Sequence, residues 1–132
     1  MSVLDNLKYA ETGLIPAIIQ DAGSGEVLMF AFTNAEALRR SLLTGRMHFY
    51  SRSRKKLWMK GEESGHFQDV VEIRVDCDED AVLVRVKQSG GACHTGFRSC
   101  FFRKLEPLDA DNGRLVENGH RVFDPDSVYK KK

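Results

Sequence analysis

The sequence predicts an α+β fold: a single compact domain of mainly antiparallel strands with few helices. Three observations support this prediction. The chain has 132 residues, which suits one hydrophobic core rather than two. Short apolar, β-branched stretches recur along it, separated by turn-forming residues. The clearest helical spacing of apolar residues follows Thr33.

The first predicted elements are a strand pair and a helix. Residues 14–20 and 27–32 are apolar and β-capable, and the Gly- and Ser-containing loop between them favours an antiparallel hairpin. Thr33 and Glu36 have the spacing of a capping box, apolar residues follow at helical intervals, and Gly45 is a stop signal. We therefore expect a helix between Thr33 and Gly45.

The rest of the chain predicts further strands. They are expected at 47–50, 57–59, 71–75, 81–87 and 100–105. Val71, Ile73 and Val75 alternate with charged residues, which is typical of a half-buried strand. Beyond a turn at 109–113 the sequence is polar and little regular structure is expected. We therefore predict a domain over 1–105 and a partly ordered C-terminal extension over 106–132.

Composition and charge exclude several classes of protein. The net charge is +1 and 42% of residues are hydrophobic, as in an ordinary soluble protein. No apolar stretch is long enough to span a bilayer, and residues 1–8 lack the basic leader and apolar block of a signal peptide. The basic run 129–132 suits solubility better than nucleic-acid contact. We expect a cytoplasmic protein with neither a nucleic acid nor a membrane as partner.

A dense acidic cluster offers ligands for a hard cation. Asp76, Asp78 and Asp80 place carboxylates at alternating positions, and a divalent ion such as Mg²⁺ would neutralise their mutual repulsion. A calcium-binding EF-hand loop is excluded, because Ala81 and Lys87 stand where that loop needs Gly and Glu. A solvated acidic turn between two strands is the other interpretation.

The three cysteines suggest a zinc site. Cys77, Cys93 and Cys100 are an odd set in a reducing compartment, which argues against a disulfide framework. Three thiolates can hold Zn²⁺ and leave a fourth position for water, and His94 could carry the proton that a water addition requires. Buried structural thiols, a structural role for His94, and Cys93 as a nucleophile activated by His94 are the alternatives.

A basic segment between the strands suggests phosphate recognition. Cations and hydroxyls are combined there with glycines that let backbone amides approach an anion. The candidate substrate-binding residues are Arg52, Arg54, Lys60 and Ser64. The segment matches no Walker-type loop or dinucleotide fingerprint. Trp58 is interpreted as a core or interface anchor, with base stacking as the alternative.

Taken together, these motifs resemble the phosphoribosyl-AMP cyclohydrolase family, which carries out the third step of histidine biosynthesis. The resemblance runs in order from about residue 13 to residue 103. Its motifs are 51–54, Trp58, 60–62, 64–66, 76–78, Asp80, 91–96 and 99–101. It departs from the expected pattern at residues 32–33 and at Gly91, none of which is a proposed ligand.

The resemblance implies a specific activity and assembly. The substrate would be 1-(5-phosphoribosyl)-AMP, whose adenine ring zinc-activated water opens between N1 and C6 to give an imidazole carboxamide nucleotide. Zinc would be bound by Cys77 of one subunit with Cys93 and Cys100 of the other, and magnesium by the three aspartates. Because the zinc ligands would come from two subunits, the resemblance also implies an intertwined homodimer. A non-catalytic zinc-dependent binding module and a metal-free cysteine hydrolase are the competing classes.

Overall fold

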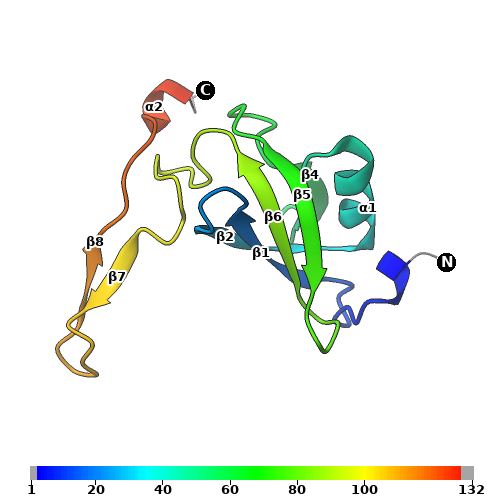
Figure 1. The fold of residues 1–132 in the computed structure, drawn as a ribbon, viewed down its shortest axis with the longest axis horizontal. Coiled ribbons are helices and arrows are strands. Elements are labelled where there is room, and N and C mark those ends of the chain that lie inside the picture. The colour runs from blue at the N-terminus through cyan, green and yellow to red at the C-terminus, as the bar shows by residue number, and fades with distance from the viewer. Residues whose placement is uncertain (1–2, 129–132) are drawn as a thin grey trace.

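A four-stranded mixed sheet lies at the centre of the molecule (Figure 1). The computed structural model describes residues 3–128, so the first two residues and the basic run 129–132 lie outside the described part. Its elements in chain order are η1 Val3–Asn6, β1 Ile15–Asp21, β2 Val27–Thr33, α1 Ala35–Thr44, β3 His48–Ser51, β4 Lys56–Met59, β5 Gln68–Val75, β6 Val82–Gln88, β7 Arg103–Glu106, β8 Arg114–Glu117 and α2 Pro125–Val128.

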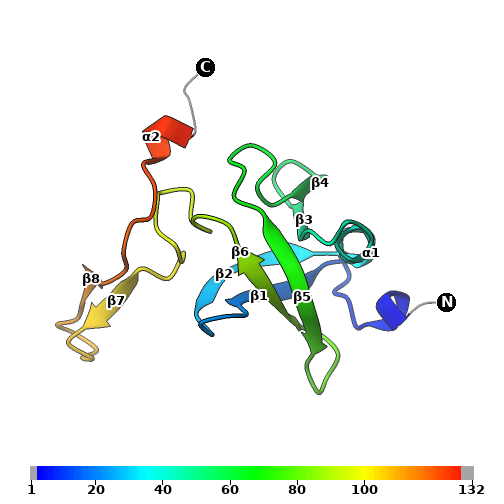
Figure 2. The ribbon, with the colours of Figure 1, turned by 45° about the horizontal axis from the view of Figure 1, so that its top comes forward.

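The strand order of the central sheet is β2-β1-β6-β5. The outer pairs, β1 with β2 and β5 with β6, are antiparallel, whereas β1 and β6 are parallel neighbours. Two antiparallel hairpins, β3–β4 and β7–β8, complete the strands of the described residues. Figures 1 and 2 show the β7–β8 hairpin apart from the sheet, on the side away from α1. The predicted α+β domain of mainly antiparallel strands is confirmed.

One face of the sheet carries the hydrophobic core. Alternate residues of the two central strands are almost completely buried: Ile15, Ala17, Ile19, Val82, Val84 and Val86. Leu38 of α1 and Phe49 of β3 belong to the same cluster, and Trp58 of β4 packs against it. The helix and the β3–β4 hairpin therefore cover this face, and β4 brings the segment after Trp58 to the edge of the core.

The helix starts one residue later than the capping-box prediction. Asn34 is the N-cap, and its Oδ1 accepts a hydrogen bond of 2.8 Å from the Ala37 amide. Thr33 ends β2, and its hydroxyl donates instead to the His48 carbonyl at 3.2 Å. Because that hydroxyl is committed to β3, the next residue with a short acceptor side chain provides the cap. Gly45, with φ of 79°, ends the helix as predicted.

The predicted burial pattern of β5 is wrong at Val71 and at Val75, which is 40% exposed at the end of the strand. The pairing with β6 shifts between Val70 and Glu72, so Val71 is the extra residue of a β-bulge. Val71 is consequently 52% exposed, and Val70 and Ile73 are the residues that pack against the core. Strict alternation in sequence did not reveal the bulge, because a bulge changes which positions share a face.

The C-terminal extension contains elements that the sequence did not predict. β7 covers only the end of the predicted strand at 100–105, and β8 and α2 follow it. After β8 the chain returns to the body, where the Val122 amide donates to the Gly96 carbonyl at 2.7 Å. In the part of the chain that the structure describes, the helices are too short to cross a membrane.

Candidate metal centre and active site

The loop that follows β6, residues 91–100, brings two of the three cysteines together. Within this cysteine loop the Ala92 amide donates to the Arg98 carbonyl at 2.8 Å and the Cys93 amide to the Phe97 carbonyl at 3.2 Å. These bonds fold the loop back on itself, so that the thiols of Cys93 and Cys100 interact directly. Cys93 is buried, with Thr95 Oγ1 2.9 Å from its sulfur, whereas Cys100 is exposed.

The thiol pair has an unfavourable environment for negative charge. Although the residue as a whole is exposed, loss of hydration around its sulfur is the main reason that the pKa of Cys100 rises to about 11, and the neighbouring Cys93 thiol raises it further. The Lys60 ammonium acts in the opposite direction. The Cys100 thiol therefore needs positive charge nearby to exist as a thiolate, which a divalent metal would supply.

Three residues that sequence reasoning missed fix the cysteine loop. Ser99 Oγ donates to the Val27 carbonyl at 2.7 Å, and Arg98 forms an ion pair of 2.9 Å with Asp21. Both contacts tie the loop to the β1–β2 hairpin, more than 70 positions earlier in the chain. A charged residue between two candidate metal ligands was the available signal for Arg98, but its partner could not be identified from sequence.

The turn between β5 and β6, residues 76–81, carries the acidic cluster and Cys77. The ligand oxygens of Asp76, Asp78 and Asp80 all lie within 4.8 Å of one another, and all three side chains are exposed. Asp76 Oδ1 accepts hydrogen bonds from the amides of Asp80, at 3.0 Å, and Ala81, at 3.3 Å. The structure therefore brings the three predicted aspartates together.

The carboxylates of this acidic turn affect one another. Desolvation raises the pKa of Asp76, but the amide and side-chain hydrogen bonds from Asp80 and the amide of Ala81 outweigh it, so that the pKa is lowered. The pKa of Asp80 is raised, first by its hydrogen bond with Asp76, then by desolvation and by the neighbouring negative charges. Such mutual repulsion is what a bound divalent cation relieves.

Cys77 does not join the other two cysteines within one chain. Figures 1 and 2 show the β5–β6 turn at one end of β6 and the cysteine loop beyond the other end. β6 has seven residues, so its ends are about 20 Å apart at roughly 3.3 Å per residue. Sulfurs on one zinc ion lie within about 5 Å of each other. Cys77 is exposed, and so it is accessible to another molecule.

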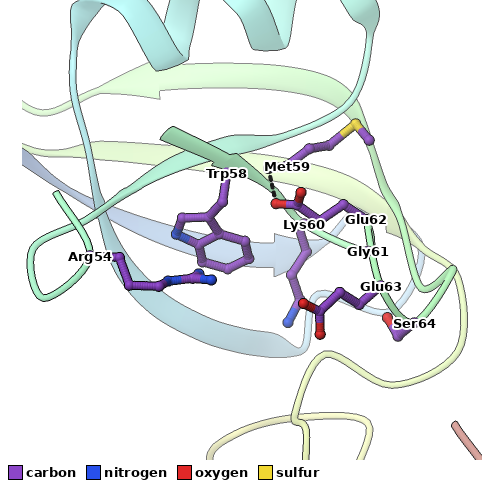
Figure 3. A pocket seen from close by; sticks show the side chains of 8 residues that line it. All are labelled: Arg54, Trp58, Met59, Lys60, Gly61, Glu62, Glu63 and Ser64. Carbon is purple, nitrogen blue, oxygen red and sulfur yellow. Dashed lines mark hydrogen bonds between the residues drawn. The ribbon is translucent and has the colours of Figure 1, made fainter. Parts of the chain in front are cut away.

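A pocket of about 130 Å³ lies beside β4 (Figure 3). It is lined by Arg54, Trp58, Met59, Lys60, Gly61, Glu62, Glu63 and Ser64. In Figure 3 the side chains of Trp58 and Lys60 extend to the same side of the chain, and the Arg54 side chain runs across the view beneath the Trp58 ring. The Met59 amide donates to Glu62 Oε1 at 3.1 Å and so closes the turn after β4. Three of the four predicted substrate-binding residues thus share one pocket.

The fourth predicted substrate-binding residue, Arg52, lies elsewhere. Its guanidinium is 4.3 Å from the centre of the Phe32 ring, in a cation–π contact with β2. Trp58 has a double role: its ring is tilted against Phe49, at 5.1 Å between centroids, and it also lines the pocket. The interpretation of Trp58 as a core anchor is therefore supported, and part of its ring also faces the pocket.

Lys60 joins the pocket to the cysteine loop. Its Nζ donates a hydrogen bond of 2.6 Å to the carbonyl of Ala92, the residue before Cys93. Burial lowers the pKa of this ammonium, and the charges of the Cys100 and Cys93 thiols act against that shift. Sequence reasoning placed Lys60 on a phosphate, and the structure places it against the loop that carries the thiol pair.

Three of the four histidines were considered as site candidates or motif residues, and they occupy different environments. His94 is exposed in the turn of the cysteine loop, where its ring is accessible to a bound molecule. His48 lies in β3, with Nδ1 2.8 Å from the Arg46 carbonyl. The His66 ring packs edge-on against Phe123 at 4.5 Å, and its Nδ1 is buried without a hydrogen-bond partner in the described structure. Of these three, His94 is the exposed one, and it is next to Cys93 in the chain.

Comparison with known proteins identifies the family. Residues 29–102 match the model of phosphoribosyl-AMP cyclohydrolase. Proteins named phosphoribosyl-AMP cyclohydrolase from Methanococcoides burtonii and Methanothrix thermoacetophila are each 56% identical to the chain, over 96% and 98% of its length and 98% and 100% of theirs. The Methanosarcina acetivorans protein of that name is 57% identical over 96% of the chain and 98% of its own length. The chain therefore belongs to the phosphoribosyl-AMP cyclohydrolase family.

Proposed function

We propose that the chain is a cytoplasmic enzyme of histidine biosynthesis that hydrolyses the N1–C6 bond in the adenine ring of 1-(5-phosphoribosyl)-AMP. The product is the phosphoribosyl-formimino imidazole carboxamide nucleotide. Family membership supports the substrate and the hydrolase class. The observation that carries the chemistry is the thiol pair of Cys93 and Cys100, joined through Lys60 to a pocket lined by Trp58.

Zinc fits the residues at the thiol pair. Two soft donors already lie together, in surroundings where their charge needs a balancing cation. We propose that Cys93 and Cys100 bind the ion with Cys77 of the partner subunit, which leaves one coordination position open. Bound zinc would supply a water with a pKa near 7, and so hydroxide at neutral pH.

The proposed unit is a homodimer that shares its sites. Cys77 is too far from the cysteine loop within one chain, so the third thiol has to come from a second copy. The face of the sheet opposite the core is open and apolar there: Ile18 pairs with Phe30 on one side and Leu83 on the other, and Ile18 and Phe30 are 39% and 49% exposed. A pocket of about 130 Å³ is also small for a nucleotide. A partner subunit would cover the face and enlarge the site.

The chain's own residues then bind and orient the substrate. Arg54 and Ser64 line the pocket and offer a forked cation and a hydroxyl for phosphate oxygens. Trp58 provides an aromatic face for a base. His94 is the candidate to carry the proton that ring opening moves, because its ring is exposed next to Cys93.

We assign a magnesium ion to the acidic turn. Asp76, Asp78 and Asp80 provide three hard oxygen ligands within one short turn, and magnesium keeps several waters in such sites. All of these site residues fall within 1–105, and we propose this stretch as the cyclohydrolase domain, with 106–132 as a C-terminal extension.

The test is turnover of the purified protein, followed by the absorbance change on ring opening, with added magnesium. Activity should disappear on chelation and return when zinc is restored. Cys93→Ser should lose bound zinc and turnover together, because half of the thiol pair is gone. Full turnover by metal-free protein would overturn the zinc assignment. If the protein binds zinc but does not turn over the nucleotide, it is a zinc-dependent binding module and not an enzyme.

A further inference from the structure

The geometry points to Lys60 as a positioning residue of the thiolate pair, and not as a phosphate ligand. Its ammonium holds the Ala92 carbonyl next to Cys93 and places a fixed positive charge against Cys93 and Cys100. This inference rests on the proposed function, in which those two cysteines bind zinc. It assigns Lys60 to the metal centre, where it acts through the ligands and touches neither the metal nor the reacting atoms.

The first support is that one N–H donor of the Lys60 ammonium is already bound to the cysteine loop. The Nζ–Ala92 hydrogen bond, at 2.6 Å, is short and links segments 32 positions apart in the chain. Ala92 is almost completely buried, so its carbonyl would lose its partner if the ammonium turned toward a phosphate. A buried carbonyl without a hydrogen bond is costly. The arrangement therefore favours a fixed lysine over one that moves to bind substrate.

The second support is that backbone contacts fix the position of the Lys60 main chain. The Lys60 amide donates to the carbonyl of Met47, a fully buried residue, at 3.0 Å. The next residue, Gly61, has φ of 92°, and a Cβ there would lie 2.7 Å from the backbone of His66. Only glycine fits at this point of the turn, and the turn as it stands places the Lys60 ammonium against the cysteine loop.

The third support is charge. A zinc ion with three thiolates has a net charge of about −1, and one ammonium brings the sum to zero. A net charge in a half-buried site is unfavourable unless a counter-charge is close. The Lys60 ammonium interacts electrostatically with both thiols of the pair. Arg54 and Ser64 remain in the same pocket for the phosphates.

The test compares Lys60→Met with Lys56→Met, a matched change at an exposed position of β4. Zinc affinity of the full-length protein is measured by competition with a chromogenic chelator. Loss of an outer partner of metal ligands weakens metal binding about 10- to 100-fold, and we expect this for Lys60→Met. Lys56→Met should bind zinc as the wild type does. Lys60→Arg keeps the charge and should recover most of the affinity.

A phosphate ligand would behave differently. If Lys60 binds substrate phosphate, Lys60→Met will raise KM and leave zinc affinity unchanged, and this result overturns the inference. Zinc-free wild type and variant are compared by thermal unfolding, so that loss of fold is separated from loss of metal. If Lys60→Met does not fold, Lys60→Gln takes its place, because it keeps a donor for Ala92. A wild-type protein that binds no zinc would instead refute the proposed function.

Discussion

At the scale of single residues, Asp21 links the β1–β2 hairpin to the cysteine loop. Its side chain is buried, and one carboxylate oxygen accepts hydrogen bonds from the Ser24 amide and hydroxyl at 2.8 and 2.9 Å. The other oxygen pairs with Arg98 at 2.9 Å. Burial opposes ionisation of Asp21, but the Ser24 hydrogen bonds and the Arg98 charge outweigh it and lower the pKa.

We predict that Asp21→Asn destabilises the protein in a pH-dependent way. The folded-state pKa is below the unfolded value of about 3.9, so the carboxylate stabilises the fold above that pH and the contribution disappears as pH falls through the folded pKa. Loss of hydrogen bonds to a charged group should cost about 1–2 kcal/mol at pH 7. Urea unfolding between pH 3 and about pH 7 measures the difference from wild type, which should shrink toward the acid end.

The matched control is Asp69→Asn. Asp69 also has an arginine partner, Arg46, but at 3.8 Å and with both side chains exposed. Exposed pairs of this kind contribute little, so this variant should unfold close to wild type. Equal effects of the two substitutions, or an Asp21→Asn effect that does not change with pH, would contradict the role given to Asp21.

Residue chemistry alone identified candidate metal ligands, but not the contacts that hold them in place. Cysteine and aspartate clusters are recognisable in sequence because thiolates and carboxylates are the donors that zinc and magnesium prefer. Lys60 was placed on a phosphate because lysines in glycine-containing turns are typical of anion sites. Its contact with Ala92 depends on how β4 packs beside the cysteine loop. No local pattern encodes that contact, nor the one between Asp21 and Arg98.

At the scale of elements, the C-terminal extension packs on the cysteine loop. The amides of Val122 and Phe123 both donate to the Gly96 carbonyl, at 2.7 and 3.3 Å, and the Arg98 amide donates to the His120 carbonyl at 3.3 Å. Phe97 and Arg121 form a β-bridge between the two segments. The segment after β8 therefore supports the loop that holds two candidate zinc ligands.

We predict that Gly96→Ala is more damaging than Gly25→Ala. Both glycines have positive φ, 104° and 80°, where alanine costs about 1–2 kcal/mol. A Cβ on Gly96 would also lie 2.5 Å from the Phe123 carbonyl, whereas one on Gly25 would meet nothing within 4 Å. Gly96→Ala should therefore lose at least about 1 kcal/mol more in denaturant unfolding and should also weaken zinc binding. If the two variants lose the same free energy of unfolding, the C-terminal extension does not pack against the cysteine loop in solution.

The sequence predicted those elements whose signals are local. The β1–β2 hairpin, α1 and the β3–β4 hairpin were predicted close to their observed bounds, because turn residues and caps mark their ends. Both β1 and β6 were predicted as strands, but their parallel pairing was not, because it joins residues 65 positions apart in the chain. β8 was missed because Arg114–Glu117 has only two apolar residues and depends on β7 for its hydrogen bonds.

At the scale of the whole molecule, the two ends of β6 carry the two parts of the proposed shared site. One end has the acidic turn with Cys77, and the other has the cysteine loop, the Lys60 contact and the pocket. The open apolar face between these ends, with Ile18, Phe30 and Leu83, is where a second copy can pack. A two-fold arrangement that brings opposite ends together would build two identical sites, because such interfaces are self-complementary.

A mixing experiment tests this arrangement directly. Cys77→Ser lacks the thiol of the acidic turn and Cys93→Ser lacks one thiol of the cysteine loop, so each variant alone should bind zinc poorly and show no turnover. If the two are unfolded and refolded together in equal amounts, about half of the dimers will be mixed. Each mixed dimer has one site with all three thiols and one with neither Cys77 nor Cys93.

About one quarter of the wild-type zinc binding and turnover should then return, since half of the dimers each regain one of their two sites. Two unmixed variants assayed at the same total concentration are the control and should show no recovery. A site built within a single chain would give no recovery after mixing, because no chain in the mixture has all three cysteines. That outcome would also conflict with the separation of about 20 Å along β6.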